Sequence, residues 1–131
     1  MKYTLTLLLC LAAGAAHGQV SMYGLYPNAT GAATTSLVLA TSGKKLFSWQ
    51  VQAGASAGYV LIYDLPADPG NGTGMAPKKC YAIAANSFLS SGMAGGPALQ
   101  FANGIVIVFS TTGCFTETQS STAFISGEAG N

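Results

Sequence analysis

Residues 46–52 read Leu-Phe-Ser-Trp-Gln-Val-Gln, so apolar and polar side chains alternate along the chain. In an extended backbone this spacing puts Phe47, Trp49 and Val51 on one face and the serine and glutamines on the other. We therefore predict a strand with one buried face. Because Trp49 is in phase with two other apolar residues, we place it in the core rather than on a ligand-binding surface.

Two further segments predict strands that are covered on both sides. Residues 104–109 read Gly-Ile-Val-Ile-Val-Phe and are apolar at every position, which is typical of a strand in the middle of a packed structure. Residues 58–65 carry tyrosine and leucine in one phase and valine and isoleucine in the other. We expect neighbouring segments to cover both faces of each.

The rest of the chain also favours strands, and no helix is expected after residue 18. Gly-, Pro- and Asn-containing turns separate short runs that are rich in β-branched and aromatic residues. The additional predicted strands cover residues 35–40, 79–84, 98–102 and 123–126. We predict an all-β fold, an antiparallel β-sandwich of about seven or eight strands, with a jelly roll as first choice and an immunoglobulin-like sandwich as second.

The first eighteen residues have the three regions of a secretory signal peptide. Lys2 is followed by an apolar run and then by Ala16-His17-Gly18, which has small residues where a signal peptidase cleaves. The run is too short to span a bilayer, so we expect no transmembrane anchor in the mature form. The predicted organisation is a signal helix at 1–18, a flexible arm at 19–34 and a β-sandwich at 35–131. The alternative is a translation start at Met22.

Charge and histidine content limit the chemistry of the mature chain. Only 7% of residues are charged, the basic residues are all lysine, and the single histidine is His17 in the signal. Nucleic-acid binding is not expected, because no basic surface is available for a run of phosphates. Without histidine or arginine, the mature chain lacks a Ser-His-Asp site, a histidine-ligated zinc site and an arginine clamp for phosphate. We predict that it is not an enzyme and binds no cofactor or metal.

The turn at residues 64–72 contains the acidic pair Asp64 and Asp68. Its Pro, Gly and Asn content is typical of turns in which carboxylates cap backbone donors, and this interpretation is preferred to catalysis by the pair. Calcium bound by the two aspartates and Asn71 remains the alternative. The candidate ligand contacts are these three residues together with Tyr23 and Tyr26, which lie before the predicted strands.

The cysteines predict a disulfide. Removal of the signal also removes Cys10 and leaves Cys80 and Cys114, and an even number in an exported domain suggests a pair. Two buried free thiols are the alternative. The lysine doublets, Lys44-Lys45 and Lys78-Lys79, lie at the starts of predicted strands and are expected to protect strand ends or edges from unwanted pairing.

Three segments together resemble a group of small structural proteins found among tailed-phage and prophage genes. They are residues 57–64 (Ala-Gly-Tyr-Val-Leu-Ile-Tyr-Asp), residues 83–86 and residues 101–113, which include Gly-Ile-Val-Ile-Val-Phe-Ser-Thr-Thr-Gly. The resemblance covers roughly Thr35 to Ser126 and implies a virion-associated or prophage-derived β-sandwich without catalytic residues. The export signal and the two cysteines are not typical of this group, and they indicate a protein that is located outside the cytoplasm.

Two functional hypotheses follow. The first is a non-enzymatic structural or interaction protein of phage or prophage type, which assembles on a particle or cell surface as a homo-oligomer or larger assembly. The chain is close to neutral, with a net charge of +1, and low net charge favours association. The second is a secreted binding module for a carbohydrate or other cell-surface ligand. Both place the protein outside the cytoplasm, in the periplasm, at the cell surface or in the extracellular space, or in a virion.

Overall fold

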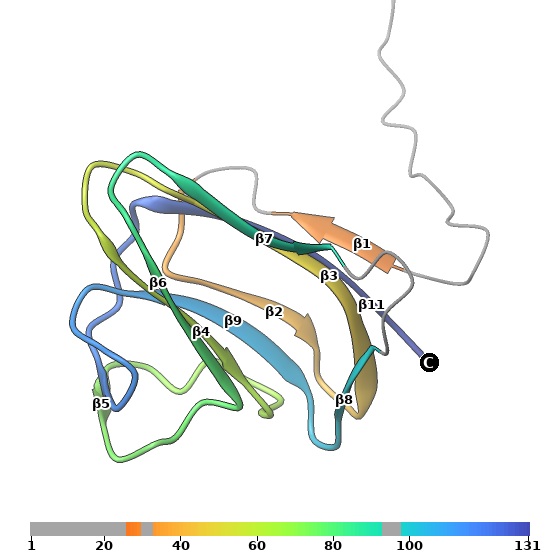
Figure 1. Cartoon of the computed structure of the whole chain (residues 1–131). Coiled ribbons are helices and arrows are strands. Elements are labelled where there is room, and N and C mark those ends of the chain that lie inside the picture. The colour runs from red at the N-terminus through yellow and green to blue at the C-terminus, as the bar shows by residue number, and fades with distance from the viewer. Residues whose placement is uncertain (1–25, 30–32, 93–97) are drawn as a thin grey trace, which may run out of the picture.

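The computed structural model describes residues 26–29, 33–92 and 98–131, and these residues form strands and no helix (Figure 1). All pairings between the strands are antiparallel. The predicted all-β, antiparallel class is therefore confirmed. The predicted signal helix lies outside the described residues. In the described part of the chain, no helix is long and apolar enough to span a membrane.

The strands form two large sheets and one small ribbon. Sheet A has the order β1 (Tyr26–Ala29), β11 (Ala123–Gly130), β3 (Lys44–Ala53) and β7 (Phe88–Gly92), and β8 (Leu99–Phe101) also pairs with β3. Sheet B has the order β2 (Ser36–Ala40), β9 (Ile105–Ser110), β4 (Gly58–Tyr63) and β6 (Lys79–Ile83). The ribbon pairs β5 (Gly72–Thr73) with β10 (Thr116–Glu117).

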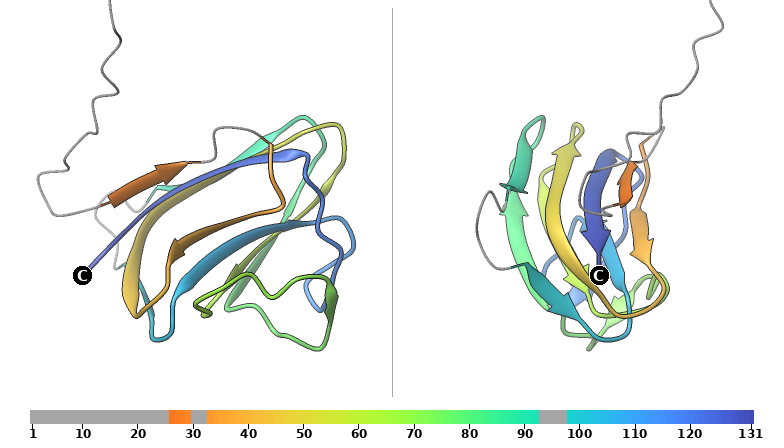
Figure 2. Two further views of the ribbon diagram at one scale, coloured as in Figure 1. Left: turned by 180° about the vertical axis from the view of Figure 1, so that it is seen from behind. Right: turned by 90° about the vertical axis from the view of Figure 1, so that its right-hand side faces the viewer.

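The main core lies between the two sheets, which face each other in Figure 2. Alternate side chains of both sheets meet there, and Trp49 is 3% exposed, which confirms its predicted place in the core. The other large members come from both sheets: Leu46, Val51, Val60, Ile62, Phe101, Ile105, Ile107, Phe109 and Ile125. Burial of this apolar surface is the main stabilising contribution to the fold.

The two strands predicted to be covered on both faces are so. All six residues of β9 are buried, as are five of the six residues of β4. One face of this pair belongs to the main core, and the opposite face forms a second cluster of Leu61, Tyr63, Val106 and Val108. The second cluster is on the side of sheet B that faces away from sheet A.

The expected phase of Phe47 was wrong. A β-bulge interrupts the pairing of β3 with β11, because Ser48 pairs with Glu128 whereas Leu46 pairs with Ala129. The extra residue, Phe47, reverses the alternation at this point. As a result Leu46 is fully buried and Phe47 is only half-buried.

The prediction of a flexible arm at residues 19–34 was wrong for residues 26–29, because these form β1 and pair with β11. The C-terminal strand also runs beyond the predicted 123–126, as far as Gly130, although glycine is a poor strand former. Its neighbours explain this. β11 is paired on both sides, and Leu39 packs so closely over Gly127 that a Cβ there would lie 2.6 Å from Leu39 Cδ1.

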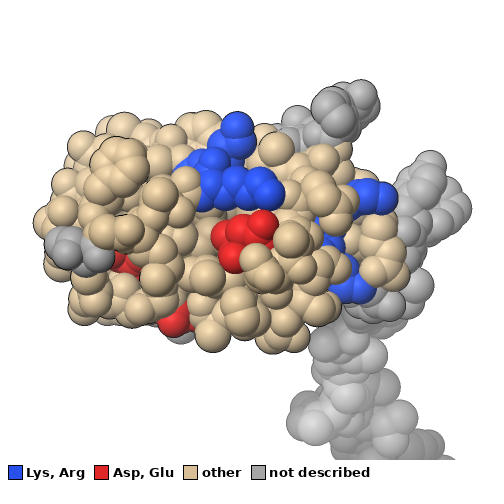
Figure 3. Space-filling model, turned by 90° about the horizontal axis from the view of Figure 1, so that it is seen from below, with Lys and Arg blue, Asp and Glu red and all other residues tan. Residues whose placement is uncertain are grey.

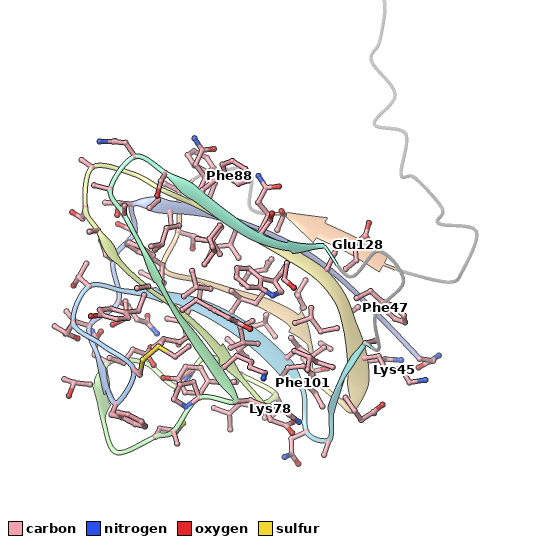
Figure 4. All side chains as sticks on the ribbon, in the orientation of Figure 1. Lys45, Phe47, Lys78, Phe88, Phe101 and Glu128 are labelled. Carbon is pink, nitrogen blue, oxygen red and sulfur yellow. A yellow bond between two sulfur atoms is a disulfide. The ribbon has the colours of Figure 1, made fainter. Side chains whose placement is uncertain are left out.

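The lysine doublets follow the expectation only in part. β6 pairs with β4 alone among the described strands, so Lys79 does start an edge strand. β3 is paired on both sides, and Lys44-Lys45 therefore does not protect an edge. Lys78 instead lies 4.6 Å from the ring centroid of buried Phe101, which Figure 4 shows on the inner side of the fold.

Candidate functional site

The residues predicted to contact a ligand do not all gather at one site, although Asp68 and Asn71 both accept hydrogen bonds from Gln119. Tyr23 lies outside the described residues, and Tyr26 begins β1, where its backbone pairs with Ala129. Asp64, Asp68 and Asn71 all lie on the segment between β4 and β6. Each of these three side chains accepts hydrogen bonds from the chain itself, as the next paragraphs describe.

Asp64 caps the turn between β8 and β9. Its Oδ1 accepts hydrogen bonds from the backbone amides of Ala102 (2.9 Å) and Asn103 (2.7 Å), and Lys78 Nζ is 3.5 Å from its Oδ2. The amide of Asn103 is the main cause of a lowered pKa of this carboxyl, with the Ala102 amide and Lys78 acting in the same direction. Asp64 is therefore a charged structural cap, as the turn composition suggested.

Asp68 and Asn71 join this segment to other parts of the fold. The Asp68 carboxylate accepts hydrogen bonds from the amide of Gly70 (2.8 Å) and from the hydroxyl of Ser36 on β2. Asn71 Oδ1 accepts one from the amide of Gln119 (2.6 Å). The described residues contain no group of three or more His, Cys, Asp or Glu side chains that could hold a metal ion. The oxygens proposed as calcium ligands thus have partners within the protein.

The sequence did not indicate a buried pair of Tyr63 and Glu117. The Tyr63 hydroxyl donates to Glu117 Oε2 (2.7 Å), and Gln119 Nε2 donates to Glu117 Oε1 (2.6 Å), so the carboxylate is satisfied although only 6% of Glu117 is exposed. Burial, followed by the contact with Glu117, raises the pKa of the Tyr63 hydroxyl. Tyr63 therefore remains a neutral hydrogen-bond donor at physiological pH.

These contacts belong to a segment that covers the outer face of sheet B. We call it the cover: residues 64–78, between β4 and β6, and residues 111–122, between β9 and β11, with the β5–β10 ribbon in it (Figure 1). A disulfide between Cys80 of β6 and Cys114 of the cover, with sulfurs 2.01 Å apart, confirms the predicted pair. Such a bond is favoured in an oxidising, extracytoplasmic compartment.

The outer face of sheet A is different, because it is polar with exposed aromatic rings. Phe124 of β11 is opposite Gln52 of β3, which is opposite Phe88 of β7. Residues that are directly opposite in neighbouring strands share a face, so these three form one row across the sheet. Phe88 is 65% exposed and Phe124 is 49% exposed. Figure 4 shows Phe88 on the outer side of β7.

The next row of this face contains Ser126, Gln50 and Ser90. An open hollow of about 460 Å³ lies beside Phe88 and is lined by Gln50, Gln52, Asn86, Ser87 and Phe88. No hydrogen bond joins the side-chain amide of either glutamine to another described residue. The sheet A outer face, defined by these two rows, thus carries glutamine amides to which no other described residue is hydrogen-bonded.

The sequence was sufficient to predict the outward direction of Phe124 on this face, but not that of Phe88. Phe124 is out of phase with Ile125 in a predicted strand, so its outward direction could have been found. Phe88 lies on β7, which the sequence analysis did not predict, because Ser-Ser-Gly after Phe88-Leu89 is a weak strand signal. Register between the strands was needed to bring the two rings into one row.

A second exposed apolar feature lies at the cover. Met75 is 47% exposed and Phe115 is 69% exposed, and the Gly74 amide donates to the Phe115 carbonyl (3.2 Å). The two side chains therefore belong to neighbouring backbone segments next to the β5–β10 ribbon. We refer to Met75 and Phe115 as the ribbon tip.

Charged side chains are few on the surface. Figure 3 shows lysines and acidic residues close together on the lower side of the molecule, on a surface that is otherwise mostly uncharged. Each of the four acidic residues accepts at least one hydrogen bond from the chain itself. Glu128 is included, because its Oε2 is 3.2 Å from Ser48 Oγ. None of the four is left as an unpartnered carboxylate.

Comparison of the chain with protein-family models, curated proteins and solved structures finds no match. The resemblance to phage and prophage structural proteins therefore stays a prediction.

Proposed function

We propose that this protein is a non-enzymatic jelly-roll protein of phage or prophage type, which is exported and assembles on a particle or cell surface. The observation that carries the proposal is the ribbon tip, an exposed apolar pair on an otherwise mostly uncharged surface. Large exposed apolar side chains on such a surface favour contacts with other protein copies.

The strand orders support the jelly roll. The strand order is β1-β11-β3-β7 in sheet A and β2-β9-β4-β6 in sheet B. Numbered without β5, β8 and β10, the eight strands make two four-stranded sheets in which the first and last strands are neighbours, as in jelly rolls. An immunoglobulin-like arrangement is less compatible, because its seven strands follow another order. Jelly rolls occur in viral capsid and lectin domains, so the fold is compatible with an assembly role.

The polar groups support a role without catalysis. The four carboxylates accept hydrogen bonds from backbone amides, hydroxyls or a side-chain amide of their own chain. A general acid or base must instead reach a proton of the substrate. Export is supported by the disulfide, which suits an oxidising compartment, together with the predicted signal peptide.

The test is the oligomeric state of the purified full chain, measured by size-exclusion chromatography with light scattering. We expect an assembly larger than a monomer for the native chain and a shift toward monomer for the Met75→Ser/Phe115→Ser double variant. Phe88→Ser is the matched control, since it removes an equally exposed ring elsewhere. A native chain that stays monomeric at all concentrations and attaches to no particle or cell surface would contradict the proposal.

A further inference from the structure

We propose that the sheet A outer face, around Phe88, Gln52 and Gln50, is a binding site for a neutral polysaccharide. The site is separate from the ribbon tip, and it specifies what the protein attaches to at a cell surface. It rests on the proposed function only in that both need an extracytoplasmic protein. The arguments for it come from the rows of the sheet, the hollow and the distribution of charge.

The spacing of the row fits an extended sugar chain. Phe88 and Phe124 are on strands on either side of β3, so their attachment points are about 10 Å apart, twice the usual distance between neighbouring strands. The C–H face of a pyranose ring is apolar and packs on an aromatic ring, which offers a flat apolar surface. Two rings at this separation can hold alternate sugars of one chain, with Gln52 beneath the sugar between them.

The polar lining of the hollow fits hydroxyl groups. Gln50, Gln52 and Asn86 each carry an amide that both donates and accepts hydrogen bonds, as a sugar hydroxyl does. The two glutamine amides make no hydrogen bond with another described residue. A hydroxylated ligand in the hollow would therefore gain contacts without breaking existing ones, and a few convergent polar groups beside an apolar surface are typical of small-ligand sites.

Asn86 is held in place at the edge of the hollow by the turn between β6 and β7. Its φ of 53° is in the left-handed region, where asparagine is tolerated better than most residues. The backbone amide of Asn86 donates to the Gly54 carbonyl (2.7 Å), and the neighbouring Ser87 hydroxyl donates to the Ala84 carbonyl (2.6 Å). This turn is thus tied to the main body, and the site is largely formed before a ligand binds.

The charge pattern selects a neutral glycan. The lining of the hollow contains no ionisable side chain. The register and the burial pattern place two charged residues farther along the same face, Glu128 two rows from Phe88 and Lys45 beyond the bulge. A sulfated or carboxylated chain would find no cation in the hollow itself. No metal is needed either, since the aspartates that could have served as calcium ligands belong to the cover of the other sheet.

The experiment uses the full chain in native gels that contain one polysaccharide each. The panel consists of a β-glucan, xylan, galactomannan and glycol chitin as neutral probes and dextran sulfate as the anionic probe. We expect at least one neutral polysaccharide to retard the protein equally with calcium or with a chelator present. A short oligosaccharide of the retained type then gives the association constant by titration calorimetry, which avoids multivalent effects.

Phe88→Ala and Gln52→Ala are each expected to lower this association constant about tenfold or more, and Phe115→Ala is expected to leave it unchanged. Phe115 is the matched control because it is an exposed phenylalanine outside the face. Near-ultraviolet circular dichroism and light scattering are measured for every variant. Failure of all neutral probes, stronger retardation by dextran sulfate, or equal losses for Phe88→Ala and Phe115→Ala would overturn the assignment.

Light scattering separates this inference from the proposed assembly. If Phe88→Ala changes the oligomeric state, then the face is a contact between protein copies and the glycan site is refuted. If the Met75→Ser/Phe115→Ser variant is monomeric but binds the oligosaccharide with native affinity, both proposals hold on separate surfaces. A chain that binds the oligosaccharide but never assembles would refute the assembly proposal alone.

Discussion

The two sheets present opposite kinds of surface on their outer sides. Sheet B has leucine, valine and tyrosine there, and the chain covers them with the segment that contains the β5–β10 ribbon. Sheet A has glutamine and serine there, with two exposed phenylalanines. An apolar sheet face needs a cover because exposure of its side chains to water is unfavourable, whereas a polar face can remain open. In this protein, the open face is the one that we propose as the glycan site.

The disulfide gives the largest expected effect on this comparison, because it attaches the cover to sheet B. It closes a loop of 34 residues, so Cys80→Ser/Cys114→Ser is expected to lower the free energy of unfolding by about 4 kcal/mol in the chain-entropy model. Urea unfolding followed by fluorescence measures the change. The native chain under reducing conditions is the control, and an unchanged midpoint in both cases would show that hydrogen bonds alone hold the cover.

Truncation of one residue on each outer face compares the two surfaces directly. Leu61→Ala removes a fully buried side chain under the cover and is expected to cost about 3 kcal/mol. Phe124→Ala removes a larger side chain from the open face of sheet A and should change stability by less than about 0.5 kcal/mol. Thermal unfolding of both variants is the measurement. Similar losses would mean that the sheet A outer face is covered in solution.

Asp64 gives a smaller and pH-dependent effect on the covered side. Its pKa is lowered in the folded protein, so its contribution to stability is fully present above the ordinary value near 4 and is lost as the pH falls through the folded pKa. Asp64→Asn is expected to lower the free energy of unfolding by about 1–2 kcal/mol at pH 7, because hydrogen bonds to a charged acceptor are weakened. Urea unfolding at a series of pH values should show this difference from the native protein shrinking toward low pH. A constant difference would contradict the assigned cap.

Local patterns were sufficient for much of the fold. The alternation in residues 46–52 and the apolar runs at 58–65 and 104–109 predicted three central strands and their burial, because side chains on a strand alternate with a period of two. The two cysteines that follow the predicted signal peptide predicted the disulfide that the structure contains. The turn composition around Asp64 and Asp68 correctly indicated capping by carboxylates.

Other features depended on partners distant in the sequence. β1 and the end of β11 have weak strand signals of their own. They form strands because they pair with each other and because β11 pairs with β3 on its other side. The bulge at Phe47 arises from pairing between β3 and β11, so alternation alone assigned this ring to the wrong side. Tyr63 and Glu117 are 54 residues apart, and nothing in the local sequence joins them.

Composition and period-two patterns act locally, and they were enough to predict an all-β chain with a central apolar strand pair, few charges and one disulfide. Which outer face is covered and which is open depends on how the sheets and loops pack. The tertiary structure brought Phe124, Gln52 and Phe88 into one row and engaged the predicted ligand contacts Asp64, Asp68 and Asn71 in holding the cover. The reason is that strand register and loop packing depend on contacts between distant residues, which no short stretch of sequence specifies.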